Sequence, residues 1–84
     1  MEGFDQAQVY LARGKERHLI TTEADGEIQK CSSNGAPREG WLNTDKLHQI
    51  NRADVCYLVL DEGELAIVIK SIDGNQAHFF AINL

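Results

Sequence analysis

The chain has 84 residues, of which 43% are hydrophobic and 25% charged, so it is long enough for one small domain with a thin core and too apolar for a disordered chain. Its formal net charge is −5, and residues 53–84 contain one Lys against five Asp or Glu. Because an acid excess repels phosphate backbones, we expect a single domain over residues 1–84 that does not bind nucleic acid non-specifically.

The amino-terminal sequence bears on the compartment. Residues 1–5 lack the basic and apolar regions of a secretory signal peptide, and no apolar run approaches the roughly 20 residues that a membrane-spanning helix needs. We therefore expect a cytoplasmic protein without membrane contact, in which Cys31 and Cys56 are both reduced.

The first segment, Phe4 to Ala12, admits two interpretations. Phe4, Ala7 and Leu11 fall at helical spacing, whereas the β-branched Val9 and the alternation around it favour a strand. We favour the strand. The helix leads to an alternative fold, α+β with an amino-terminal helix packed on a sheet.

Turn residues divide the following segment. Arg13–Arg17 is polar and contains a Gly, which predicts a turn, and the β-branched residues of His18–Glu23 predict a strand. The pair Asp25-Gly26 is typical of a two-residue hairpin loop. We therefore expect Glu27–Cys31 to turn back as the partner of the preceding strand.

An irregular stretch separates the two halves of the chain. Ser32–Gly40 holds the single Pro and two Gly, and we interpret it as a surface loop. Trp41 after it is predicted to plug one end of the core. A short helix is expected from about Asp45 to Arg52, with Leu47 and Ile50 packed inward.

Three apolar runs separated by turn residues dominate the second half. The runs are Val55–Leu60, Leu65–Ile69 and Ala77–Ile82, which indicate a three-stranded antiparallel meander. The predicted fold is therefore mainly β: a small curved antiparallel sheet or barrel of five to six strands, with one short helix.

The turns set which residues share a face of the meander. With Asp73-Gly74 as a two-residue loop, Val68 would pair with Phe79. The first turn holds either Gly63 in a three-residue loop or Glu62-Gly63 in a two-residue loop. Both faces are largely apolar in either case, although an antiparallel sheet usually keeps one face polar.

An apolar second face predicts a partner. We expect a homo-oligomer, most simply a dimer, or contact with another protein through the meander. The candidate partner-binding residues are Tyr57, Ile67, Ile69, His78, Phe80 and Ile82.

The chemistry-bearing residues form no recognisable constellation. The three His are not spaced as metal ligands and the two Cys form no CxxC, so we expect no metal and no cofactor. Cys56 is interpreted as a small core residue, and Lys70 as a strand residue that reaches water and pairs with an acid. We expect no catalytic residues and no enzymatic activity, and predict a small protein-interaction or regulatory module.

One basic segment supports an alternative function. A small barrel could bind single-stranded nucleic acid with a basic patch and an aromatic side chain, although interleaved Glu residues weaken this interpretation. The residues of this candidate patch are Tyr10, Arg13, Lys15, Arg17 and Lys30.

Overall fold

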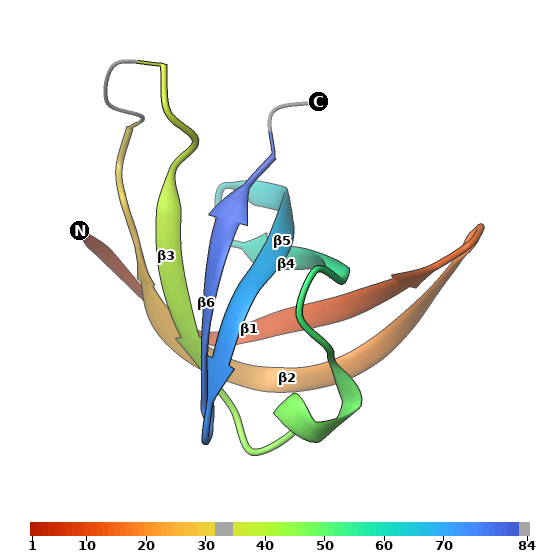
Figure 1. Cartoon of the computed structure of the whole chain (residues 1–84). Helices are drawn as coiled ribbons and strands as arrows, with labels where there is room; N and C mark the ends of the chain where they lie inside the picture. Colours follow the sequence, from red (N-terminus) through yellow and green to blue (C-terminus); the bar gives the residue numbers. More distant parts are fainter. Residues whose placement is uncertain (32–34, 83–84) are drawn as a thin grey trace.

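A computed structural model describes residues 1–31 and 35–82 and shows six antiparallel strands that close into a barrel (Figure 1). Around the barrel the order is β1-β2-β3-β6-β5-β4, and β1 pairs with both β2 and β4 to close it. The strands are β1 (Glu2–Arg13), β2 (Glu16–Ile28), β3 (Glu39–Asn43), β4 (Val55–Leu60), β5 (Gly63–Asp73) and β6 (Gln76–Ala81). The mainly β prediction is confirmed, and the α+β alternative is wrong because residues 2–13 are extended.

Alternating side chains of every strand fill the barrel, as the period of two in a strand requires. Phe79, Leu42, Leu58 and Ile67 are the largest side chains that are fully buried. The remaining core is made of small and branched residues, in keeping with the narrow interior of a six-stranded barrel. Residues 32–34, part of the predicted surface loop, lie outside the described residues, and β3 already begins at Glu39.

The predicted hairpin at Asp25-Gly26 is wrong, because β2 runs straight through this pair to Ile28. Gly26 serves another purpose. A Cβ there would lie 2.0 Å from the carbonyl oxygen of Trp41 on β3, so only glycine permits this close approach of the two strands. Local turn chemistry is overridden by a tertiary contact.

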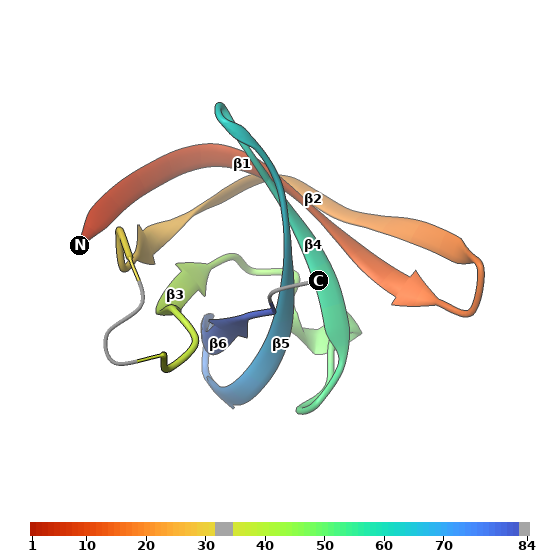
Figure 2. The same cartoon turned by 90° about the horizontal axis from the view of Figure 1, so that it is seen from above.

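The turn predicted within Arg13–Arg17 is confirmed, with Gly14 at φ +59°. β1 pairs with β4 only as far as Leu11, and the hairpin then continues away from the barrel in both views (Figures 1 and 2). We call the projecting residues Ala12–His18 the arm.

One end of the barrel is covered by the connection between β3 and β4. The predicted helix over Asp45–Arg52 is a single 3-10 turn, η1 (Leu47–Gln49). The inward packing of Leu47 and Ile50 is confirmed, since each is only 3% exposed. So short a helix depends on this packing. No helix in the described part of the chain is long or apolar enough to cross a membrane.

The meander is present, but its predicted register is wrong. The loop between β5 and β6 is Gly74-Asn75, since Asp73 pairs with Gln76. Lys70 is an extra residue between the Ile69 and Ser71 pairs, which makes a β-bulge. Together these two changes place Val68 opposite Phe80 instead of Phe79.

The first meander turn also differs from both alternatives. Leu60 pairs with Gly63, so Asp61-Glu62 is the loop and Gly63 begins β5 with φ +135°. Negative φ at both loop residues suits their side chains, whereas glycine takes the positive φ that follows.

Candidate interaction surface

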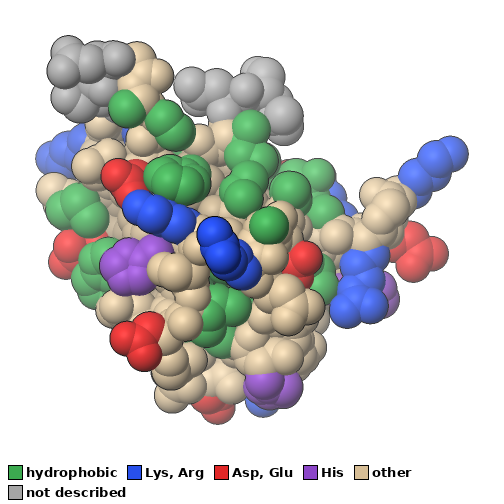
Figure 3. Space-filling model, viewed as in Figure 1, with side chains coloured by type: hydrophobic (Ala, Val, Ile, Leu, Met, Phe, Trp, Pro, Cys, Tyr) green, Lys and Arg blue, Asp and Glu red, His purple; other side chains and the backbone are tan. Residues whose placement is uncertain are grey.

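The outer side of the meander carries a row of apolar side chains. Val55 on β4 pairs with Val68 on β5, and Val68 pairs with Phe80 on β6. Tyr57 and Val59 point outward from β4, between its inward residues. All five are only half-buried in the isolated chain. We call these five residues the meander face; Figure 3 shows hydrophobic side chains gathered over β5 and β6.

Two ion pairs border the meander face. Nη1 of Arg17 lies 2.7 Å from Oε2 of Glu64, and Nζ of Lys70 lies 3.1 Å from Oε1 of Glu39. All four side chains remain 40–50% exposed. The predicted pairing of Lys70 with an acid is confirmed.

Each of these cations also lies over an aromatic ring of the face. The guanidinium carbon of Arg17 is 3.8 Å from the Tyr57 ring centroid, and Nζ of Lys70 is 5.0 Å from that of Phe80. Both distances are in the range of cation–π contacts. The hydrogen bond to Glu64 raises the pKa of Arg17 above its usual value, so this residue stays charged.

Of the six candidate partner-binding residues, two are buried in the core and four are accessible at the surface. Ile67 and Ile69 point into the core and are 0% and 1% exposed, so they contribute nothing to an outer surface. The bulge at Lys70 is the reason, because it puts these residues on the same side as Phe79. Tyr57, Phe80 and Ile82 are half-buried and His78 is exposed.

Sequence reasoning missed Val55, Val59 and Val68 as surface residues. Their alternation with Cys56 and Leu58 on β4 and with Ile67 and Ile69 on β5 is visible in the sequence. The missing information was which member of each alternating pair faces inward, and only barrel closure decides that.

The basic patch is only partly assembled. Arg13, Lys15 and Arg17 all lie on the arm, where Figure 3 shows Lys and Arg side chains projecting from the barrel. Lys30 follows the far end of β2, because that strand does not turn back at Gly26. Tyr10 lies at the base of the arm, where its hydroxyl donates to Oε1 of Gln8 at 3.0 Å.

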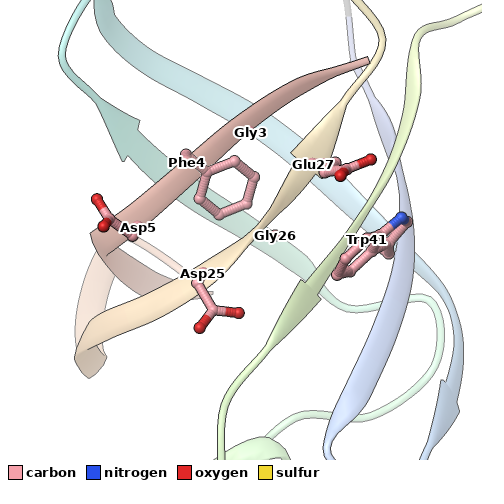
Figure 4. Close-up of a pocket in the computed structure, with 7 residues that line it drawn as sticks. All are labelled: Gly3, Phe4, Asp5, Asp25, Gly26, Glu27 and Trp41. Carbon is pink, nitrogen blue, oxygen red and sulfur yellow. The ribbon is translucent and has the colours of Figure 1, made fainter.

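A groove lies across β1, β2 and β3 on another part of the surface (Figure 4). Its volume is about 440 Å³. It is lined by Gly3, Phe4, Asp5, Asp25, Gly26, Glu27 and Trp41. We expected Trp41 to plug the core, which is wrong: Gly40 and Leu42 take the inward positions on β3, and Trp41 is half-buried on the outside.

Cys56 is confirmed as a core residue with 0% exposure. Burial, with a smaller contribution from the charge of Asp54, raises the pKa of its thiol to about 12. A thiol of this kind is protonated at neutral pH and is a poor nucleophile. Cys31 is exposed, and neither cysteine forms a disulfide.

The His, Cys, Asp and Glu side chains of the described residues do not gather into a metal site. No three His, Cys, Asp or Glu in the described ranges lie close enough to hold a metal ion. The described surface offers an apolar face with charged margins, a basic arm and a shallow groove beside Trp41. Comparison with known protein families, with curated proteins and with solved structures gives no match for this chain.

Proposed function

We propose that the protein is a non-enzymatic interaction module that self-associates through the meander face. The observation that carries the proposal is the outward row formed by Val55, Val68 and Phe80 across three neighbouring strands. The outer side of a barrel normally carries polar residues between the inward apolar ones. A contiguous apolar row of this kind is typical of a surface that another protein covers.

Charge favours a second copy of the chain as the occupant. The chain as a whole carries −5, which opposes self-association over most of the surface. The margins of the meander face hold two cations and two anions, Arg17 with Glu64 and Lys70 with Glu39. Two faces related by a two-fold axis therefore meet without net repulsion, as an isologous interface requires.

The size of the molecule sets the extent of such an interface. A stable dimer buries about 800 Å² per partner, which is roughly 15% of the 5384 Å² surface of this chain. Five apolar side chains alone do not provide that area. The interface must therefore include the charged margins, which makes it sensitive to salt.

Sedimentation equilibrium at micromolar concentration tests the proposal. The wild type should sediment at twice 9.4 kDa, and Phe80→Asp should sediment as a monomer because it buries a charge in the interface. Ile72→Asp is the matched control, since Ile72 is an exposed apolar residue outside the face. A monomeric wild type, or a Phe80→Asp protein that remains dimeric, contradicts the proposal.

The arm supports a second candidate function, contact with single-stranded nucleic acid. Arg13 and Lys15 lie at the turn between β1 and β2 and are exposed, and Figure 2 shows this hairpin extending away from the barrel. Fluorescence anisotropy of labelled RNA at low salt should then rise with the wild type and not with an Arg13→Glu, Lys15→Glu double variant. Absence of binding by the wild type removes this candidate.

A further inference from the structure

β2 has a free edge along the arm and the adjoining part of the barrel. One side of β2 pairs with β1, but β3 pairs with its other side only over Asp25–Ile28. Over Glu16–Ala24, no strand in the described part of the chain lies on that second side (Figures 1 and 2). None of these residues makes a backbone hydrogen bond outside the sheet ladder. Unpaired N–H and C=O groups in a row are a template for a further strand.

The register of the arm shows which backbone groups this edge presents. Arg13 and Glu16 flank a two-residue loop and form a hydrogen-bonded pair, after which bonded and non-bonded pairs alternate. Arg17 and Leu19 therefore direct their N–H and C=O groups away from β1, to the free edge.

The barrel end of this edge is already partly satisfied. The hydroxyl of Thr21 accepts from the backbone N–H of Glu23 at 3.1 Å. The open part of the edge is therefore Glu16–Thr22, which is long enough for an added strand of about five or six residues.

A groove of about 420 Å³ lies beside the open edge. Its lining residues come from β1 and β2 on one side and from the connection around η1 on the other. Leu11 and Ile20 are the buried members of this lining. Arg13, His18 and His48 supply its N–H donors and positive charge, and none of the described residues that line it is Asp or Glu.

The groove is basic on a molecule that is acidic as a whole. The chain carries −5, so this local excess of cationic and donor groups is specific to the arm and η1. Glu16 lies opposite Arg13 in the ladder, but neither belongs to an ion pair of the described residues. Arg13 therefore remains available to a carboxylate from another molecule.

We propose that the free edge of β2 binds an extended segment of a partner protein that carries acidic side chains at alternate positions. Its backbone bonds to Arg17 and Leu19 and continues the sheet by strand addition. Side chains of a strand alternate between the two sides, so the acidic ones enter the groove. The apolar ones between them lie beside Leu19, which is 51% exposed.

The backbone edge selects a polypeptide over other anions, because only a polypeptide repeats N–H and C=O groups at the spacing of a strand. The edge lies outside the meander face, formed by Val55, Tyr57, Val59, Val68 and Phe80. This site therefore does not rest on self-association.

The probe is the capped peptide acetyl-Thr-Glu-Val-Glu-Val-Glu-Thr-amide. It reads the same in both directions, so it suits a parallel or an antiparallel strand. Isotope-labelled protein titrated with it should show saturable amide shifts over Glu16–Thr22 and slower amide exchange at Arg17 and Leu19. The same response is expected in the Phe80→Asp variant.

Side-chain variants test the groove. Arg13→Gln should weaken binding of this peptide about tenfold, as expected for the loss of a charge-assisted hydrogen bond. Lys15→Gln is the matched control, because it removes the same charge from the same turn but lies outside the groove. This control should bind the peptide as the wild type does.

Modified peptides test the added strand. One form carries N-methyl groups on both Val residues, and another carries them on the three Glu residues. Because alternate N–H groups of a strand face its neighbour, one form should lose binding and the other should keep it. A peptide with Lys in place of Glu is attracted by the net charge of −5, yet it should bind at least about tenfold more weakly because the groove repels it.

Five results overturn the proposal. The first is the absence of saturable shifts with the acidic peptide. The second is equal weakening by Lys15→Gln, which assigns the effect to overall charge. The third is equal binding of the two methylated peptides, which contradicts strand addition. The fourth is binding of the Lys peptide as tightly as the acidic one. The fifth is a larger response over the same residues to single-stranded RNA, which assigns the edge to nucleic acid.

Discussion

Gly26 provides a sharp test of how the barrel is built. A Cβ at this position would lie 2.0 Å from the carbonyl oxygen of Trp41 and 2.9 Å from Cα of Leu42. Both are backbone atoms, so no rotamer change relieves the contact. The strands must separate by about 1 Å to restore a 3.0 Å contact, and this movement disrupts the ladder between β2 and β3.

We expect Gly26→Ala to lower the free energy of unfolding by about 3 kcal/mol, at the upper end of the usual cost of overpacking. That loss is a large part of the roughly 4–13 kcal/mol expected for a chain of this length. Urea denaturation followed by far-UV circular dichroism measures it. Gly3→Ala is the control, because a Cβ there would lie no closer than 3.7 Å to any neighbour. Its free energy of unfolding should stay within about 0.5 kcal/mol of the wild-type value. Equal midpoints for the two variants would refute the close approach of β2 and β3.

Other consequences concern the thiols and the arm. A thiol reagent at pH 8 should modify Cys31 in the native protein and Cys56 only after denaturation, because Cys56 is buried with a pKa of about 12; equal reactivity would contradict this. Since the folded pKa of Cys56 lies above its ordinary value of 9.0, its contribution to stability is complete below about pH 9 and declines as the pH rises toward 12. Urea midpoints that stay constant between these two pH values would contradict this contribution of Cys56. Arg17→Lys should leave the global midpoint unchanged and speed amide exchange in the arm, since it loses the stack on Tyr57. Arg13→Lys is the control and should leave amide exchange in the arm unchanged. Equal exchange rates in the two variants would show that the contact between Arg17 and Tyr57 does not hold the arm in place.

Local sequence patterns predict most of the strands. The β-branched residues around Val9 and at Ile20 identify β1 and β2, and the three apolar runs identify β4, β5 and β6. The positions of Leu47 and Ile50 also follow from their spacing. These features depend on neighbours within a few residues, where backbone geometry fixes which side chains share a side.

Features that depend on distant strands were not predictable in the same way. Asp25-Gly26 has turn chemistry, but β3 needs Gly26 for close packing. The bulge at Lys70 shifts the pairing of β5 and β6 by one residue, and one residue exchanges the two faces of a strand. That exchange moved Ile67 and Ile69 from the expected surface to the core.

The position of Trp41 shows the same limit. Trp41 lies beside Glu27 because β3 pairs with β2, which no local pattern indicates. The alternation of Gly40, Trp41 and Leu42 is the one signal that could have placed Trp41 outside the core, because a glycine and a leucine flank it.

Contact between two copies of the meander face can be observed directly. In a mixture of isotope-labelled and unlabelled chains, filtered NOE spectra record only contacts between molecules. Self-association through this face predicts intermolecular NOEs from the ring protons of Phe80 to the methyl groups of Val55 and Val68. Absence of such NOEs at concentrations where the chain should be dimeric, or a single 9.4 kDa species at those concentrations, would contradict the central claim.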